Sequence, residues 1–306
     1  MSDKKHNSLI AFGLLVVVIM WGGNNAGTKW LVGSWPPVWT GSVRFIFAGA
    51  ILLGVLRFTS WLGQFEKLTP ELWRELWGRG GLSLAIYTGF FCWALHLAPA
   101  AHVALYLGAS PIWALLWEGW PQRNWSSLRR YAAAVLAVTG VLVLFWPALR
   151  AGADHHLLGE FFGLAASISW ANYSRQSRLL SNRINGLEVA ANSMWMAGAI
   201  LFPVGLWEVS RQGLIVDVKH FGVQGLCIFF GGVIPYAIWN SALRHWRTSQ
   251  VMLFNNFIPL TTAAWVYFLL GEPLTSTFYA AMILIVSGVI LGQVDVAKIF
   301  NLPESF

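Results

Sequence analysis

The sequence has 306 residues, of which 57% are hydrophobic and 11% are charged, and its mean hydropathy is +0.58. This composition excludes an ordinary soluble globular protein and indicates an integral membrane protein. The net charge of +7 comes from basic residues that flank apolar segments and report orientation in a membrane, so we expect a lipid bilayer and no nucleic acid as partner.

Apolar segments follow one another along the whole chain. The first continues through Trp21 without a small-residue cleavage site, which predicts a spanning helix and not a removed signal. Short connections marked by proline leave no room for a soluble domain. The sequence therefore predicts an all-α, multi-pass protein of the cell (inner) membrane. Its ten transmembrane helices, each near the roughly 20 residues that cross a bilayer, are expected at about 9–29, 38–58, 80–97, 100–119, 130–148, 157–177, 187–208, 221–242, 248–270 and 275–296.

The stretch 93–117 recurs in degenerate form at 241–265. A shift of 148 residues aligns Pro111 with Pro259, and chance recurrence of Leu, Ala and Val is the alternative explanation. The same shift, within one residue, aligns Val103 with Val251, Trp117 with Trp265 and Trp21 with Trp170. These matches favour a duplicated chain. We expect two five-helix repeats that form one transport domain, residues 1–150 and 151–306.

Five helices per half is an odd number, so two such halves enter the membrane in opposite orientations. This predicts an inverted repeat with a binding site between the halves near the midplane. Lys and Arg decide the orientation, because cytoplasmic loops carry an excess of them. The side that holds the N-terminus collects fifteen, so we expect both termini to be cytoplasmic. The opposite side keeps four: Lys29, Arg150, Arg211 and Lys219.

Polar side chains inside apolar spans are candidates for substrate contact, although hydrogen bonds between packed helices are the common alternative. In the first half, Asn24 and Asn25 lie within WGGNNAGTKW, and Tyr106 lies near Pro111 in the fourth helix. We expect these three to bind substrate. Lys29 and Arg44 are possible contacts for a substrate charge, but Lys29 lies close enough to the span end to extend into water.

The second half offers a corresponding set. The sixth helix carries WANYSRQSR, in which Trp170, Asn172 and Tyr173 are candidates for substrate binding. Arg175 is a possible charge contact, with positive-inside anchoring as the alternative. Prolines in the eighth and ninth helices free backbone carbonyls that can line a cavity. Beside them lie the remaining candidates, Tyr236, Trp239, Asn240, Asn255 and Asn256.

Acidic residues are expected at span ends and not near the midplane, at Glu118, Glu160, Glu188, Glu208, Glu272 and Asp295. A proton-driven carrier usually needs an ionisable group near the midplane, most often a carboxylate. We therefore expect facilitated diffusion. His96 and His102 could titrate or bind a metal, but two imidazoles without a third ligand more often lie at a boundary. Cys92 and Cys227 lie in apolar segments and supply neither a disulfide framework nor a four-ligand site. We expect no metal and no cofactor.

These features resemble a known family over nearly the whole chain. The ten spans, the WGGNNAGTKW opening, Arg44 in the second helix and LGEPLT at 270–275 resemble the drug/metabolite transporter superfamily in its EamA-domain branch. WANYSRQSR and YAIWNSALRHW resemble its aromatic amino acid exporter subfamily. The first half departs from the usual pattern, with EGWP at 118–121 where GEP-like residues often stand. The resemblance implies export of a small metabolite through a cavity lined by the first, third, fourth, sixth, eighth and ninth helices.

The polar residues in the spans fit that implication. Amides, tyrosines and tryptophans, with cations and no midplane anion, suit a zwitterion or weak anion that has an apolar side chain. We expect an exporter of amino acids, aromatic or otherwise apolar, that works by alternating access. A monomer is compatible with the sequence. One alternative is a membrane-embedded enzyme acting on a lipid-linked substrate, which needs acid–base groups or a metal; another is a scaffold subunit.

Overall fold

The computed structural model describes residues 2–60, 68–110, 112–113, 125–151, 154–245, 251 and 253–293. Within these ranges the regular structure is helical. In chain order the helices are α1 (Ser2–Val32), α2 (Pro37–Phe58), α3 (Pro70–Glu75), η1 (Leu76–Gly81), α4 (Leu82–Leu97), α5 (Ala100–Gly108), α7 (Trp125–Ala151), α8 (Asp154–Ser181), α9 (Gly186–Gln212), α10 (Val218–Leu226), η2 (Cys227–Val233), α11 (Ile234–His245), η3 (Leu253–Phe257), α13 (Ile258–Leu270) and α14 (Ser276–Gln293).

The ten apolar segments predicted from the sequence lie on these helices wherever the structure describes them. The third is longer than expected, because α3, η1 and α4 run on from Pro70 to Leu97. Two shorter apolar helices are Tyr131–Pro147 and Ser276–Leu291. Among the described residues, five stretches are long and apolar enough to cross a membrane: Ser8–Val32, Pro37–Phe58, Pro70–Leu97, Gly186–Gln212 and Val218–Trp239.

Local chemistry accounts for several helix ends. Asn185 and Asp217 precede α9 and α10, and their side chains accept backbone N–H groups of the first turn. For Asp217 the donor is the N–H of His220 at 2.8 Å, which lowers the pKa of the Asp217 carboxyl. Gly213 and Gly271 follow α9 and α13 with φ of 76° and 66°, where a side chain would be strained. These residues end the helices where the connections begin.

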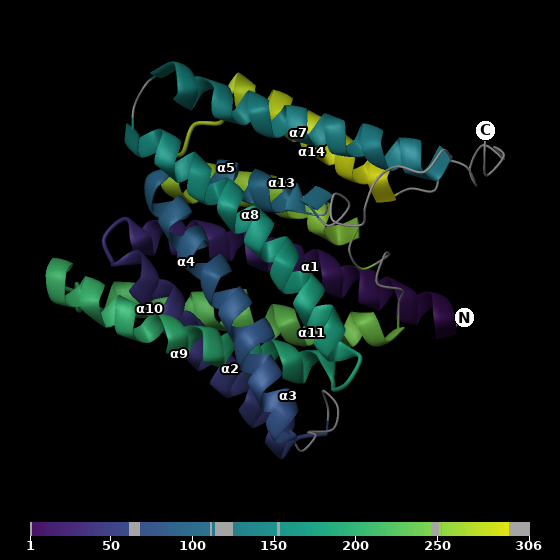
Figure 1. Ribbon diagram of the computed structural model, residues 1–306, viewed down its shortest axis with the longest axis vertical. Coiled ribbons are helices and arrows are strands. Elements are labelled where there is room, and N and C mark those ends of the chain that lie inside the picture. The colour runs from purple at the N-terminus through teal and green to yellow at the C-terminus, as the bar shows by residue number, and fades with distance from the viewer. Residues whose placement is uncertain are drawn as a thin grey trace.

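Glycines bring two pairs of distant helices together. Figure 1 shows α7 and α14 side by side along one edge of the molecule, with α2 and α9 toward the opposite edge. In the α2–α9 pair, a Cβ on Gly49 would lie 2.6 Å from the Trp195 nitrogen. A Cβ on Gly198 would likewise lie 2.7 Å from the Ile46 nitrogen. The two backbones therefore approach as closely as the absence of side chains permits.

These contacts recur at the offset seen in the sequence. Adding 149 to Gly49 and Ile46 gives Gly198 and Trp195, so the two contacts of the α2–α9 pair are counterparts. The α7–α14 pair repeats the relation at an offset of 148. There Gly140 meets Ala281 and Ile285, whereas Gly288 meets Ala133 and Ala137.

Two π-helical segments lie within the apolar stretches Pro70–Leu97 and Val218–Trp239. The segment η1 has the sequence LWGRGG, and η2 has CIFFGGV. Their glycine pairs lie against neighbouring helices: a Cβ on Gly81 would be 2.7 Å from Met196 Cβ, and one on Gly232 would be 2.6 Å from Ala48 Cβ. Short π segments are frequent at functional sites. Both segments lead directly into helices that carry tyrosines of the candidate site.

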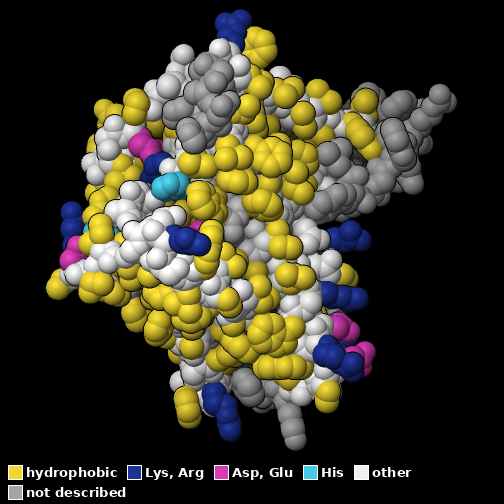
Figure 2. Space-filling model, turned by 60° about the vertical axis from the view of Figure 1, so that its left-hand side comes forward, with side chains coloured by type: hydrophobic (Ala, Val, Ile, Leu, Met, Phe, Trp, Pro, Cys, Tyr) yellow, Lys and Arg dark blue, Asp and Glu magenta, His cyan; other side chains and the backbone are white. Residues whose placement is uncertain are grey.

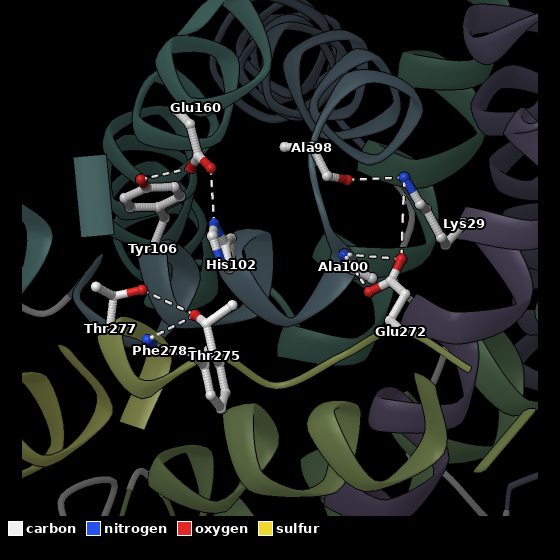
Figure 3. A network of polar contacts seen from close by, with 10 residues as sticks. All are labelled: Lys29, Ala98, Ala100, His102, Tyr106, Glu160, Glu272, Thr275, Thr277 and Phe278. Carbon is white, nitrogen blue, oxygen red and sulfur yellow. Dashed lines mark hydrogen bonds and ion pairs between the residues drawn. The ribbon is translucent and has the colours of Figure 1, made fainter. Parts of the chain in front are cut away.

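At one end of the helix bundle, hydrogen bonds link a helix end and a connection to other connections. Lys29 Nζ, near the end of α1, donates to the Ala98 carbonyl at 2.8 Å. Trp35 Nε1 donates to the Ile215 carbonyl, also at 2.8 Å. We call this the Glu160 end, because buried Glu160 lies there (Figure 3).

The exterior carries many apolar side chains. In Figure 2 they cover much of the face shown, whereas Lys and Arg lie mostly toward its margins. A water-facing surface rarely exposes so many large apolar groups together, so this distribution fits contact with lipid. Among the most exposed are Phe12, Phe47, Val135, Trp207, Phe268 and Ile283.

Candidate functional site

An aromatic pair joins α1 to α11. The rings of Trp21 and Tyr236 lie 5.8 Å apart in an edge-to-face arrangement, which is favourable for aromatic rings. Trp21 Nε1 also donates to the Gly231 carbonyl in η2 at 3.2 Å. Both aromatic side chains remain partly exposed. The contact therefore fixes the tryptophan against the π segment and leaves ring surface uncovered.

A second aromatic pair joins α4 to α8. The rings of Tyr87 and Trp170 lie 4.9 Å apart, and Tyr173 lies 5.4 Å from Trp170. This pair is the counterpart of the first, because adding 149 to Trp21 and to Tyr87 gives Trp170 and Tyr236. We call the two contacts the Trp–Tyr pairs.

Arg44 lies between these helices and is 3% exposed. Its Nη1 donates to Thr28 Oγ1 at 2.9 Å and to Asn24 Oδ1 at 3.3 Å. Its guanidinium lies over the rings of Phe45 and Phe91, at 4.8 and 5.6 Å from their centres. The described partners of this buried cation are thus neutral oxygens and aromatic faces. Its Nε is buried and has no hydrogen-bond partner in the described part of the chain.

The two Trp–Tyr pairs and Arg44 belong to one site. Tyr173, Tyr87 and Arg44 lie within electrostatic range of Tyr236, so residues of α2, α4, α8 and α11 converge. Asn24, Trp170 and Tyr236 keep partly exposed surface. The site combines one cation, phenol and amide groups, and several aromatic faces. It can pair with an anionic group and contact an apolar one.

Two predicted residues lie instead at the Glu160 end (Figure 3). Lys29 is bonded to Ala98 and lies 4.0 Å from Glu272. Tyr106 is fully buried and donates its hydroxyl hydrogen to Glu160 at 2.6 Å. Both side chains are therefore engaged in contacts between helices and connections.

Three further candidates contribute to helix packing. Asn25 is buried, and its Nδ2 donates to Thr262 Oγ1 of α13 at 3.0 Å. Asn172 Nδ2 donates to Ser83 Oγ of α4 at 3.4 Å. Trp239 is buried in an apolar cluster with Leu14, Val17, Ala242 and Val251. These contacts are those expected for packing between helices, which the sequence analysis gives as the alternative to substrate binding.

The remaining candidates lie toward other parts of the molecule. Arg175 is exposed on α8. Asn255 and Asn256 lie in the 3-10 helix η3 and are half-buried. Asn240 lies on α11, and its side chain is outside the described part of the structure.

Two aromatic residues of the site are missing from the sequence-based set. Trp21 is predicted to lie in a span but not to bind substrate, and Tyr87 carries no local signal because tyrosine is common in apolar helices. The offset of 149 would have identified both, since it aligns them with Trp170 and Tyr236, which are predicted.

Within the described residues, no group of three or more His, Cys, Asp or Glu could hold a metal ion. Cys92 and Cys227 are buried as free thiols.

A helical chain with several apolar spans and an apolar exterior is a multi-pass membrane protein. The chain belongs to the EamA-like transporter family, which matches residues 8–146 and again 157–292. The resemblance to the EamA-domain branch is thereby confirmed. It is a transporter family, which argues against an enzyme.

Individual relatives agree with this assignment. Proteins named "Probable amino-acid metabolite efflux pump" from Salmonella typhimurium and Escherichia coli are each 23% identical to this chain. The Salmonella alignment covers 92% of this chain and 93% of the relative, and the Escherichia coli alignment covers 91% and 92%. An uncharacterized inner membrane transporter of Escherichia coli is 24% identical over 91% of this chain and 88% of its own length.

One solved crystal structure matches the fold with a TM-score of 0.60 and 20% identity, covering 96% of this chain and 99% of the other. At this identity the likeness bears on the fold alone.

Proposed function

We propose that the protein exports amino acids with aromatic or other apolar side chains across the inner membrane. Export proceeds by alternating access at the site formed by Arg44 and the Trp–Tyr pairs. The relatives named as efflux pumps support the substrate class, and the composition of the site supports it independently.

The observation that carries this proposal is the buried charge of Arg44. A buried cation is stable only when an anion or several hydrogen bonds compensate it. Its described partners are neutral, and its Nε is unpaired among the described residues. A substrate carboxylate would supply the missing negative charge. The adjacent Trp–Tyr pairs would then contact the apolar side chain of the same substrate.

The arrangement of the chain supports this mechanism. We propose two inverted repeats, residues 1–150 and 151–306, with ten spans and both termini in the cytoplasm. Reciprocal glycine contacts and matched Trp–Tyr pairs at offsets of 148 and 149 favour a pseudo-two-fold relation. Sites between inverted repeats allow alternating access when one half rocks against the other. In this orientation the Glu160 end faces outside.

The proposed mode of transport is facilitated diffusion, without coupling to a proton gradient. Arg44, the charged member of the central site, is poorly suited to releasing a proton near neutral pH. Glu160, Glu208 and Glu272 lie at the Glu160 end, as hydrogen bonds to His102, Val38 and Ala100 place them. The substrate gradient alone would then set the direction of net transport.

Transport into liposomes tests the proposal. Purified protein in liposomes should take up radiolabelled tryptophan, phenylalanine or leucine above protein-free liposomes, and Arg44→Gln should remove most of this uptake. Arg57→Gln, an exposed arginine on the same helix, should leave it intact. Absence of amino acid transport by folded wild-type protein would refute the proposed substrate class.

A specific arrangement bears on the enzyme alternative. Asp217, His220 and Ser34 form a chain of contacts, with Asp217 Oδ2 and Ser34 Oγ each 2.8 Å from a nitrogen of the His220 ring. A serine hydrolase also needs N–H donors facing the developing oxyanion. Ser34 follows the carboxyl end of α1, which presents carbonyl oxygens and not N–H donors. The arrangement therefore favours a link between connections over catalysis.

A further inference from the structure

A buried acid–imidazole contact joins α5 to α8 at the Glu160 end (Figure 3). Glu160 is 4% exposed, accepts the Tyr106 hydroxyl at 2.6 Å and lies 2.7 Å from His102 Nδ1. The Tyr106 ring packs on α8, where a Cβ on Gly163 would lie 2.6 Å from it. The side chain of His102 keeps 15% of its surface exposed, so the contact is not completely enclosed.

Among the described residues, His102 is the basic side chain that pairs with Glu160. Lys29 is engaged with Ala98 and Glu272 on the far side of the chain that enters α5. Ionisable or aromatic groups on the other neighbouring elements include His96 on α4, which contacts the Val32 carbonyl, and Arg150 on α7, which lies over Trp146. The Phe145 ring of α7 lies 5.5 Å from the Tyr106 ring, and Phe278 of α14 stacks on His102 and contacts Tyr279 edge to face.

The strength of the contact between His102 and Glu160 depends on whether the imidazole carries a second proton. When His102 is neutral, its Nδ1–H donates to a buried carboxylate whose negative charge is not neutralised. When His102 takes up a proton, the pair is neutral overall and the hydrogen bond joins two charged groups, which strengthens it. Burying an uncompensated charge is costly. The protonated pair therefore holds α5 to α8 more firmly, and imidazole takes up its proton between about pH 5 and 8.

We propose that His102 and Glu160 form a proton-binding site on the external side, and that bound proton holds this end of the transporter closed. The proposal rests on the orientation given above. A low pH on the external side strengthens the closure, and a high pH on that side weakens it. Because the proton enters and leaves from one side, it regulates the rate of transport and does not drive accumulation. The site is thus compatible with facilitated diffusion through the centre.

Access to a buried position packed against α8, one residue from Glu160, gives the most direct test: a Cβ on Gly159 would lie 2.9 Å from the Ala98 nitrogen. Ala98 is 1% exposed at the start of the segment that leads into α5. A cysteine placed there by Ala98→Cys should react with a membrane-impermeant maleimide only when the closure opens. Val218→Cys, at a position 89% exposed, corrects for the effect of pH on the thiol reaction. Protein without either substitution measures any labelling of the buried natural cysteines.

We expect corrected labelling of Ala98→Cys to be about fivefold slower at about pH 6 than at about pH 8, since a hydrogen bond between charged groups is stronger than one to a neutral donor. In this background His102→Gln, which keeps a donor but cannot titrate, should remove the difference. Glu160→Gln should do the same. His96→Gln should retain it, because His96 contacts a backbone carbonyl and not a carboxylate.

Several outcomes would overturn the proposal. These are equal corrected labelling at both pH values, a difference that survives His102→Gln, or a difference that His220→Gln removes and His102→Gln does not. Unchanged melting temperatures identify variants that fold. Because labelling needs no substrate, the result is independent of whether the protein transports amino acids.

Discussion

At the scale of single residues, the proposed function assigns to Arg44 the recognition of the substrate carboxylate. A hydrogen bond to a charged group contributes about 1.5–3 kcal/mol, which corresponds to roughly 10- to 100-fold in affinity. We expect Arg44→Gln to raise the KM for amino acid transport by at least about tenfold. Arg44→Lys should have an intermediate effect, because lysine keeps the charge but not the planar fork.

Substrates without a carboxylate provide the control for this prediction. An amino acid amide should be transported poorly by wild-type protein, and Arg44→Gln should not reduce its transport further. If Arg44→Gln impaired the acid and the amide equally at normal membrane abundance, Arg44 would have a structural role and not a role in recognition.

Sequence reasoning points to only part of the proposed site, because several of its candidates have partners far away along the chain. Asn24 and Arg44 could be predicted because a polar group in an apolar span is costly wherever it points. The partners of Lys29 and Tyr106 lie 69 and 54 residues away along the chain, so no local pattern encodes those bonds. The burial of Glu160 was missed likewise, because its place near a span end is typical of a solvated carboxylate.

At the scale of elements, glycines fix how closely the helices pack. We expect Gly49→Ala to destabilise the protein by about 1–3 kcal/mol, because the added carbon would lie 2.6 Å from the Trp195 backbone and α2 must shift from α9. Gly198→Ala should cost a similar amount if the two helices are pseudo-symmetric counterparts. Melting temperature in detergent measures both.

The matched control for this experiment is Gly54→Ala. Gly54 lies on α2 with no atom within 4 Å of an added Cβ, so the change should be neutral or slightly stabilising. Equal melting temperatures for Gly49→Ala and Gly54→Ala would contradict the close approach of α2 and α9.

The apolar segments could be predicted because hydropathy and length alone specify them. The π segments η1 and η2 could not, because a change of hydrogen-bond register inside a helix leaves the hydropathy pattern unaltered. Each contains a glycine pair that lies against other helices. The packing role of such glycine pairs is visible only when the position of the neighbouring helix is known.

At the scale of the whole molecule, orientation is the property most open to direct test. In intact cells, Val218→Cys should react with an impermeant maleimide added outside, whereas Asn182→Cys should react only after the membrane is opened. Val218 follows the connection after α9, and Asn182 follows α8 at the opposite end of the bundle. Labelling of both from the same side would contradict the proposed topology.

Counterflow in liposomes tests the central claim, transport of an amino acid down its own gradient through the site at Arg44. Liposomes preloaded with unlabelled tryptophan or leucine should transiently concentrate the labelled form above equilibrium, without a pH gradient and in the presence of an uncoupler. Liposomes carrying Arg44→Gln should show little of this overshoot, and those carrying Arg57→Gln should match wild type. Overshoot that requires a proton gradient, or that persists undiminished in Arg44→Gln, would contradict the claim.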